Sequence, residues 1–212
     1  LGLIIDGDNY YSKLTFKSKS DITRKTEGYY LVSGKQKTIE DTYHHCDLTF
    51  TTAKGNELIL RFKVFDSSVA FRYEINSKNG QETCYIFAEK TTFNLPNAGK
   101  MWGQPYDNIS KWTPAYEEYY YNGIDIGTSA PPEKNGWAFP LLFNTKDIWI
   151  LITEAAIYDN NAAMRLEADC NSGDYKITLP VEDEAYHECS SIPLVEIPWS
   201  SPWRIILVSK DL

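Results

Sequence analysis

Two short apolar runs separated by a turn constrain the fold of this 212-residue chain more than any other feature. The runs are residues 139–143 and 148–152, and the four residues between them, Asn144-Thr145-Lys146-Asp147, are typical of a hairpin turn. Consecutive side chains of a strand point to opposite faces, so the second run is apolar on both faces. Such a strand is expected in the middle of a sheet stack, covered on both sides and ending at Thr153 and Glu154.

The carboxylate of Glu154 lies at the predicted end of this buried strand. Burying a carboxylate costs free energy unless the group is solvated, paired with a positive charge or bound to a cation. The simplest explanation is that Glu154 emerges into solvent where the strand ends. A functional role for the carboxylate is the alternative, and the residues alone leave both open.

The rest of the chain has the strand period of two. Residues 58–64 and 69–75 alternate apolar and polar side chains around a turn at Asp66-Ser67-Ser68, which predicts an antiparallel hairpin with Arg72 and Glu74 on one face. Further strands are expected at residues 1–5, 29–32, 44–52, 84–88, 163–169, 175–179 and 203–208. No long amphipathic helix is predicted, and residues 153–160 could form one helical turn. The pattern indicates one all-β domain over residues 1–212.

Composition and charge exclude several function classes. A net charge of −8 and a pI near 4.9 argue against nucleic-acid binding, which requires clustered lysine and arginine. No apolar run approaches the ~20 residues of a membrane span, so membrane insertion is not expected. The chain opens on Leu-Gly-Leu-Ile-Ile without an initiating methionine, so the lack of an export signal says nothing about location.

Residues 92–136 differ from the rest, being rich in proline, glycine and aromatic residues with little periodicity. We interpret this segment as a long ordered loop, because its aromatic side chains need a surface to pack on. Trp112 and Tyr116 are candidate sugar-stacking residues, and so are its other aromatic residues: Trp102, Tyr106, Tyr119, Tyr120 and Tyr121. A small aromatic core that holds the loop against the sheet is the commoner explanation for such a cluster.

The recognised motifs of catalytic and metal sites are absent or poorly spaced. His44-His45-Cys46 lies on a predicted strand, where adjacent side chains cannot converge on one zinc ion. The four cysteines (Cys46, Cys84, Cys170 and Cys189) form no CxxC pair, and a Cys170–Cys189 bridge or free buried thiols are both open. The carboxylate runs Glu117-Glu118 and Glu182-Asp183-Glu184 are more typical of solvated loops than of a catalytic pair.

Five blocks of sequence, in the right order and spanning nearly the whole chain, resemble the N-terminal domain of glycoside hydrolase family 97. Residues 65–74 (FDSSVAFRYE) are similar to the family's FNDGVAFRYE hairpin, and residues 1–3 to its LGL strand. Trp112-x-Pro114 followed by tyrosines resembles its central loop. Residues 152–159 (ITEAAIYD) match its xxEAxLxDY block, and residues 201–204 (SPWR) its closing strand.

The resemblance implies a β-super-sandwich like that of galactose mutarotases, with antiparallel sheets and a long aromatic-rich loop. It implies an exported, periplasmic α-glucosidase or α-galactosidase that acts on α-linked oligosaccharides. In the family, the glutamate of the EA block, here Glu154, reaches the catalytic (β/α)₈ barrel of the same polypeptide and binds its active-site calcium. The family's catalytic carboxylates lie on that barrel, so this chain alone is expected to be inactive.

Two other functions remain open from the sequence. A free-standing carbohydrate-binding sandwich would use the aromatic residues of the 102–121 segment to bind glycan. A purely structural sandwich would bind neither sugar nor calcium.

Overall fold

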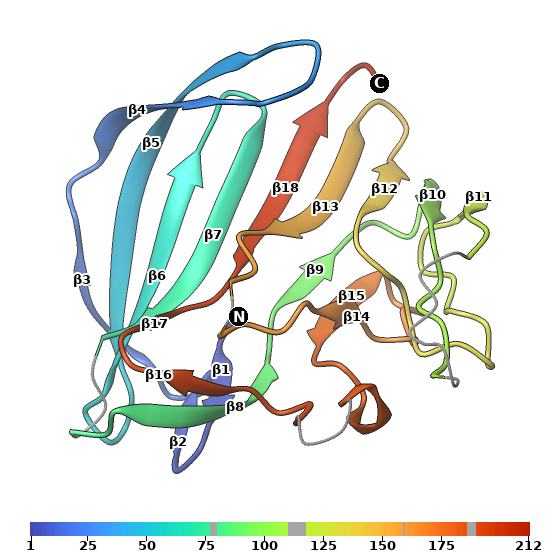
Figure 1. Ribbon diagram of the computed structural model, residues 1–212. Helices are drawn as coiled ribbons and strands as arrows, with labels where there is room; N and C mark the ends of the chain where they lie inside the picture. Colours follow the sequence, from blue (N-terminus) through green and yellow to red (C-terminus); the bar gives the residue numbers. More distant parts are fainter. Residues whose placement is uncertain (77–79, 110–117, 159, 186–189) are drawn as a thin grey trace.

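The described residues form three antiparallel β-sheets in a computed structural model of the chain (Figure 1). The structure describes residues 1–76, 80–109, 118–158, 160–185 and 190–212. The largest sheet has eleven strands in the order β11-β10-β12-β13-β18-β7-β6-β5-β3, with β4 paired to β5 and β17 paired to β7. Its strands are β3 (Thr15–Lys19), β4 (Thr23–Tyr30), β5 (Thr38–Thr51), β6 (Glu57–Val64), β7 (Ser68–Ile75), β10 (Lys100–Gly103), β11 (Tyr121–Asp125), β12 (Leu141–Asn144), β13 (Trp149–Ala155), β17 (Trp199–Ser200) and β18 (Trp203–Ser209).

Two smaller sheets have the orders β16-β8-β1-β2 and β14-β15-β9. Their strands are β1 (Leu3–Ile5), β2 (Asp8–Tyr10), β8 (Thr83–Glu89), β16 (Leu194–Glu196), β9 (Thr92–Asn94), β14 (Arg165–Leu166) and β15 (Asp174–Thr178). Within the described residues the helical content is one short 3₁₀ turn, η1 (Glu182–Glu184). This arrangement confirms the predicted all-β sandwich.

The core lies between one face of the large sheet and the two smaller sheets. Alternate side chains of β7, among them Phe71, Tyr73 and Ile75, belong to one buried cluster with Ile86 of β8 and Tyr175 of β15. The opposite residues of β7 point away from this cluster, because strand side chains alternate between faces. We call the face that carries Phe71 the inner face of the large sheet and the other its outer face.

The predicted central hairpin is confirmed: β12 pairs with β13 in the register Leu141↔Ile152 to Asn144↔Trp149. The expectation that β13 is covered on both faces is wrong. Ile152 on the inner face is 1% exposed, whereas Leu151 on the outer face is only half-buried. Leu151, Leu142 and Leu207 line an outer-face groove of about 210 Å³. The apolar run at residues 148–152 therefore reflects a sheet whose outer face is also apolar but only partly buried.

Three strand predictions need correction. Strand β13 does not end at Thr153 but continues to Ala155, so the helical turn predicted for residues 153–160 is absent at its start. Residues 163–169 contain only the two-residue strand β14. The strand predicted at residues 29–32 overlaps only the end of β4, and β3 and β4 are both exposed along their whole length. A strand exposed on both faces has no apolar alternation from which to predict it.

The hairpin of β6 and β7 is confirmed in register, with Arg61↔Arg72 and Phe62↔Phe71 as opposing pairs. Arg72 donates to Glu74 at 2.5 Å on the outer face, as the alternation predicted. No helix in the described part of the chain is long and apolar enough to cross a membrane.

The two faces of β13 predict different responses to truncation. Replacing Ile152 with Ala should lower the free energy of unfolding by about 2–5 kcal/mol, because it opens a cavity in the core. Replacing the neighbouring, half-buried Leu151 with Ala should cost clearly less. Urea unfolding of both variants measures the difference, and equal losses would contradict the assignment of inner and outer faces.

Candidate functional site

Glu154 lies inside β13, directly opposite Arg204 of β18. Its side chain is 7% exposed, so the carboxylate does not emerge into solvent. Arg204 Nη1 donates to Oε2 at 2.5 Å, and the backbone N–H of Met164 donates to Oε1 at 2.9 Å. The carboxylate is therefore buried and held by one charged and one neutral donor, which corrects the simplest explanation from the sequence.

Arg204 also contacts a second glutamate, Glu89 at the end of β8, and does so through two hydrogen bonds. The guanidinium donates to both carboxylate oxygens of Glu89, from Nε to Oε1 at 3.0 Å and from Nη2 to Oε2 at 2.6 Å. The two side chains are 0% and 1% exposed. A two-point contact of this kind is the strongest geometry an arginine and a carboxylate can form. Strand β18 is thus joined to the smaller sheet by a fully buried ion pair.

Neutral hydrogen bonds extend this ion pair to the start of the chain. The Thr91 hydroxyl donates to Glu89 Oε1 at 2.6 Å, and the Tyr73 hydroxyl lies 2.8 Å from the Thr91 oxygen. The N–H of Gly2 donates to the Tyr73 oxygen at 2.9 Å. Because the Thr91 proton points to Glu89, the Tyr73 proton must point to Thr91. The side-chain oxygens of Tyr73 and Thr91 thus both have partners, and burial raises the pKa of Tyr73.

The cluster holds two carboxylates and one guanidinium, which leaves one negative charge without a partner. Burial raises the pKa of Glu154, against the opposing influence of Arg204. Burial also works to lower the pKa of Arg204, but the two glutamates outweigh it and raise that pKa. Both oxygens of Glu154 accept hydrogen bonds, a pattern that suits the ionised form. With Glu154 ionised, the two carboxylates and one guanidinium carry a net negative charge.

The carboxylate suits one position in a calcium site and no more. Calcium takes six to eight oxygen ligands, and each Glu154 oxygen accepts only one hydrogen bond here, which leaves a lone pair free. The described residues contain no group of three or more histidine, cysteine or acidic side chains placed to hold a metal. Glu154 can therefore supply one ligand, and the others must come from elsewhere.

Several residues singled out from the sequence lie outside the described part of the chain. They are Trp112, Tyr116, Glu117 and Cys189. Among the others, Cys46 and Cys170 are free thiols, and burial raises the pKa of Cys170 to about 12. His45 lies 3.3 Å from Asp47 on the outer face, whereas Cys46 is on the opposite side of β5.

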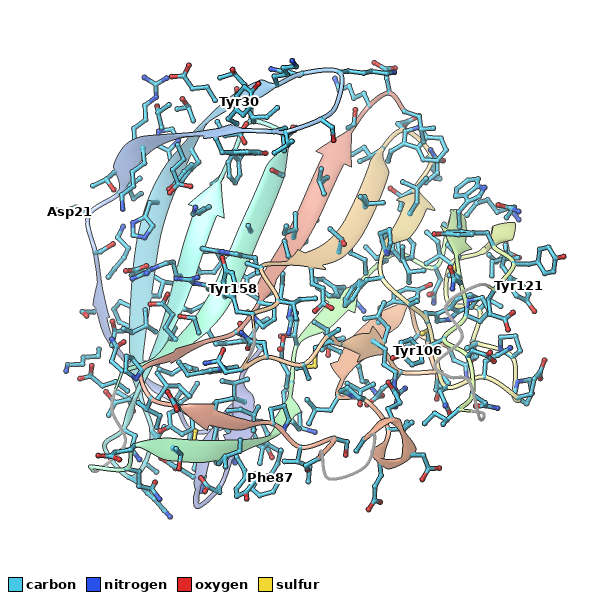
Figure 2. The ribbon with its side chains drawn as sticks, viewed as in Figure 1. Asp21, Tyr30, Phe87, Tyr106, Tyr121 and Tyr158 are labelled. Atoms are coloured by element: carbon cyan, nitrogen blue, oxygen red, sulfur yellow. The ribbon has the colours of Figure 1, made fainter. Side chains whose placement is uncertain are left out.

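Of the remaining acidic candidates, Glu182 and Asp183 are exposed, whereas Glu118 and Glu184 are held in structural contacts. Glu118 forms an ion pair with Lys134, which also contacts Asp107 at 2.6 Å. Glu184 of η1 accepts a hydrogen bond from the Tyr106 hydroxyl at 2.6 Å. These contacts hold the loops near β10 and β11 against the rest of the fold. Figure 2 shows Tyr106 and Tyr121 in the region of these loops.

Aromatic residues of the long segment also pack on the fold. Trp102 of β10 contacts Trp149 with ring centroids 5.2 Å apart, and Tyr121 meets the fully buried Trp137 edge-on at 5.7 Å. Tyr119 and Tyr120 differ, being 91% and 51% exposed. The described aromatic residues thus form the small core expected as the commoner explanation, with exposed tyrosines beside it.

Sequence reasoning missed Arg204 and Glu89 as partners of Glu154. The SPWR block contained Arg204, and an arginine in a strand as apolar as residues 203–208 is a signal that it needs a buried carboxylate. Glu89 gave no such signal, because it ends an ordinary alternating strand.

Removing Arg204 should destabilise the fold strongly. Arg204→Met leaves two buried carboxylates without a counter-charge and should cost about 3–5 kcal/mol. Lys17→Met, which breaks the exposed Lys17–Glu57 pair, should cost less than about 1 kcal/mol. Chemical denaturation compares the two, and a similar small loss for both would contradict the burial of the Arg204 cluster.

The raised pKa of Glu154 predicts a pH dependence of stability. The folded chain keeps this proton at pH values where the unfolded chain, with a pKa near 4.5, has released it. The stabilisation is complete below that pH and is lost as the pH rises through the folded pKa. In metal-free buffer, the stability of the wild type relative to Glu154→Gln should therefore fall as the pH rises above about 4.5. A relative stability that increases with pH would contradict this.

Comparisons with known proteins identify the family. The model of the glycosyl-hydrolase 97 N-terminal family matches residues 1–212. A crystal structure of a β-arabinopyranosidase superimposes with a TM-score of 0.90 at 22% identity, covering 99% of this chain and 34% of that protein. A glycoside hydrolase family 97 enzyme from Pseudoalteromonas sp. strain K8, in complex with acarbose, gives a TM-score of 0.76 at 22% identity, covering 99% of this chain and 30% of that one. The chain thus spans about a third of the length of these structures, and it belongs to the glycosyl-hydrolase 97 N-terminal family.

Proposed function

We propose that this chain is the N-terminal β-sandwich of an exo-acting α-glycosidase, an α-glucosidase or α-galactosidase. In this role it packs on a catalytic (β/α)₈ barrel of the same polypeptide, and Glu154 supplies one ligand to a calcium ion shared with that barrel. Family membership supports the glycoside hydrolase context. The observation that carries the calcium role is the buried cluster of Glu154, Glu89 and Arg204, whose one uncompensated negative charge attracts a cation.

The chemistry of such an ion is electrophilic: bound calcium polarises a sugar hydroxyl or orients water. The part played by this chain is to hold one ligand rigidly. Glu154 is on a central strand, and its two oxygens accept hydrogen bonds from Arg204 and the Met164 N–H. A side chain that is already held in place loses little conformational entropy when it binds a metal.

We propose further that the long aromatic segment forms part of the substrate pocket, with Trp112 and Tyr116 contacting an α-linked oligosaccharide. One related family 97 structure contains acarbose and another contains panose. The proposal also includes export of the protein to the periplasm, in keeping with the family resemblance.

A free-standing carbohydrate-binding module is the second candidate. The observation in its favour is the exposure of Tyr119 and Tyr120 next to the packed aromatic residues. Exposed aromatic faces can stack on sugar rings. This candidate predicts oligosaccharide affinity in the chain alone, lost in Trp112→Ala.

Hydrolysis assays separate these functions. Aryl α-glucosides, α-galactosides and, because of the arabinopyranosidase likeness, β-arabinopyranosides are offered to this chain alone and to the polypeptide that includes the barrel. We expect no turnover by the chain alone, and calcium-dependent turnover by the longer polypeptide. Glu154→Gln should raise the calcium concentration required for half-maximal activity about 10- to 100-fold or more. Turnover by the chain alone, or a Glu154→Gln enzyme with an unchanged calcium requirement, would reject the proposal.

A further inference from the structure

The buried cluster shares its one guanidinium unequally between its two carboxylates. Arg204 makes two hydrogen bonds to Glu89, at 3.0 Å and 2.6 Å, through Nε and Nη2. It makes one to Glu154, through Nη1. Because paired, coplanar contacts are the more stable geometry for a guanidinium and a carboxylate, the positive charge of Arg204 is matched mainly by Glu89.

The surroundings fix this division. Glu89 is 1% exposed, and the Thr91 hydroxyl holds its Oε1 at 2.6 Å, so its carboxylate cannot turn away from Arg204. Glu154 is 7% exposed and lies at the less enclosed end of the cluster. The two acidic groups therefore have different roles. Glu89 neutralises Arg204, and Glu154 keeps its own negative charge.

We propose that Glu89 is the positioning residue that sets the charge of the cation site: by neutralising Arg204, it leaves Glu154 with an uncompensated charge. This inference rests on the proposed calcium role of Glu154. Arg204 then orients the Glu154 carboxylate without cancelling its charge. Without Glu89, Arg204 would pair with Glu154 alone, and the pair would be neutral and a poor cation ligand.

The calcium affinities of four variants test this proposal. They are Glu89→Gln, Glu74→Gln, Glu154→Gln and the double variant Glu89→Gln with Arg204→Met. Each metal-depleted protein, in the polypeptide that includes the barrel, is titrated with calcium chloride in a calorimeter, and circular dichroism verifies folding. Glu89→Gln should weaken calcium binding about 10- to 100-fold, the usual effect of losing a residue that supports a metal ligand. Glu74→Gln is the matched control: Glu74 is also buried and paired with Arg61 and Arg72, but it lies on the outer face. It should leave calcium affinity unchanged.

A double variant separates the charge of Glu89 from a merely structural role. Glu89→Gln with Arg204→Met removes the buried pair together and restores the single negative charge on Glu154. It should therefore regain at least part of the affinity lost in Glu89→Gln. If Glu89→Gln does not fold, the double variant decides alone, with affinity within about tenfold of wild type expected and a loss beyond about 100-fold overturning the proposal.

The outcomes also distinguish this inference from the function on which it rests. Glu154→Gln that binds calcium like the wild type would reject the calcium role itself. Glu154→Gln that weakens binding while a folded Glu89→Gln does not would reject only the role of Glu89. A double variant weaker than Glu89→Gln, or a Glu74→Gln control that weakens binding equally, would also overturn it.

Discussion

The guanidinium of Arg204 is the interaction on which the arrangement of the sheets depends. It is completely buried, and it joins the middle of the large sheet to Glu89 on the smaller four-stranded sheet. Hydrophobic contact between the sheets is not directional, so it does not by itself fix how one sheet lies on the other. A forked ion pair does, because its two hydrogen bonds require one orientation of both side chains. The same contact brings Glu154 into the cluster from the neighbouring strand.

The large sheet serves two purposes through its two faces. Its inner face supplies the apolar core and, at one end, the buried charges. Its outer face carries a second ionic network, in which Arg61 binds Asp47 through two hydrogen bonds and Glu74 through a third. That network is electrically balanced, with Arg72 as the second cation on Glu74. The inner cluster is not balanced, since it holds two carboxylates and one guanidinium, and the proposed calcium role of Glu154 draws on this contrast.

The strength of the local pattern decided which parts of the structure could be predicted. The β6–β7 hairpin alternates apolar and polar residues, and the β12–β13 hairpin has two apolar runs around a polar turn, so both appear directly in the sequence. Strands β3 and β4 are exposed on both faces, and polar strands look like loops. Glu154 could be proposed from its block of sequence, but its partners could not. Glu89 and Arg204 are 115 residues apart, and no local rule connects them.

The position of β18 has a consequence for how the chain is made. This strand is the last one of the sheet in sequence, at residues 203–209, yet among the described strands it lies between β13 and β7 (Figure 1). While a ribosome is still producing it, those two strands have unpaired edges facing each other, and Glu89 has no counter-ion. Open edges of apolar strands readily pair with other chains. The vulnerable period of this domain therefore lasts until β18 has been made, because the same strand pairs with both open edges and supplies the counter-ion of Glu89.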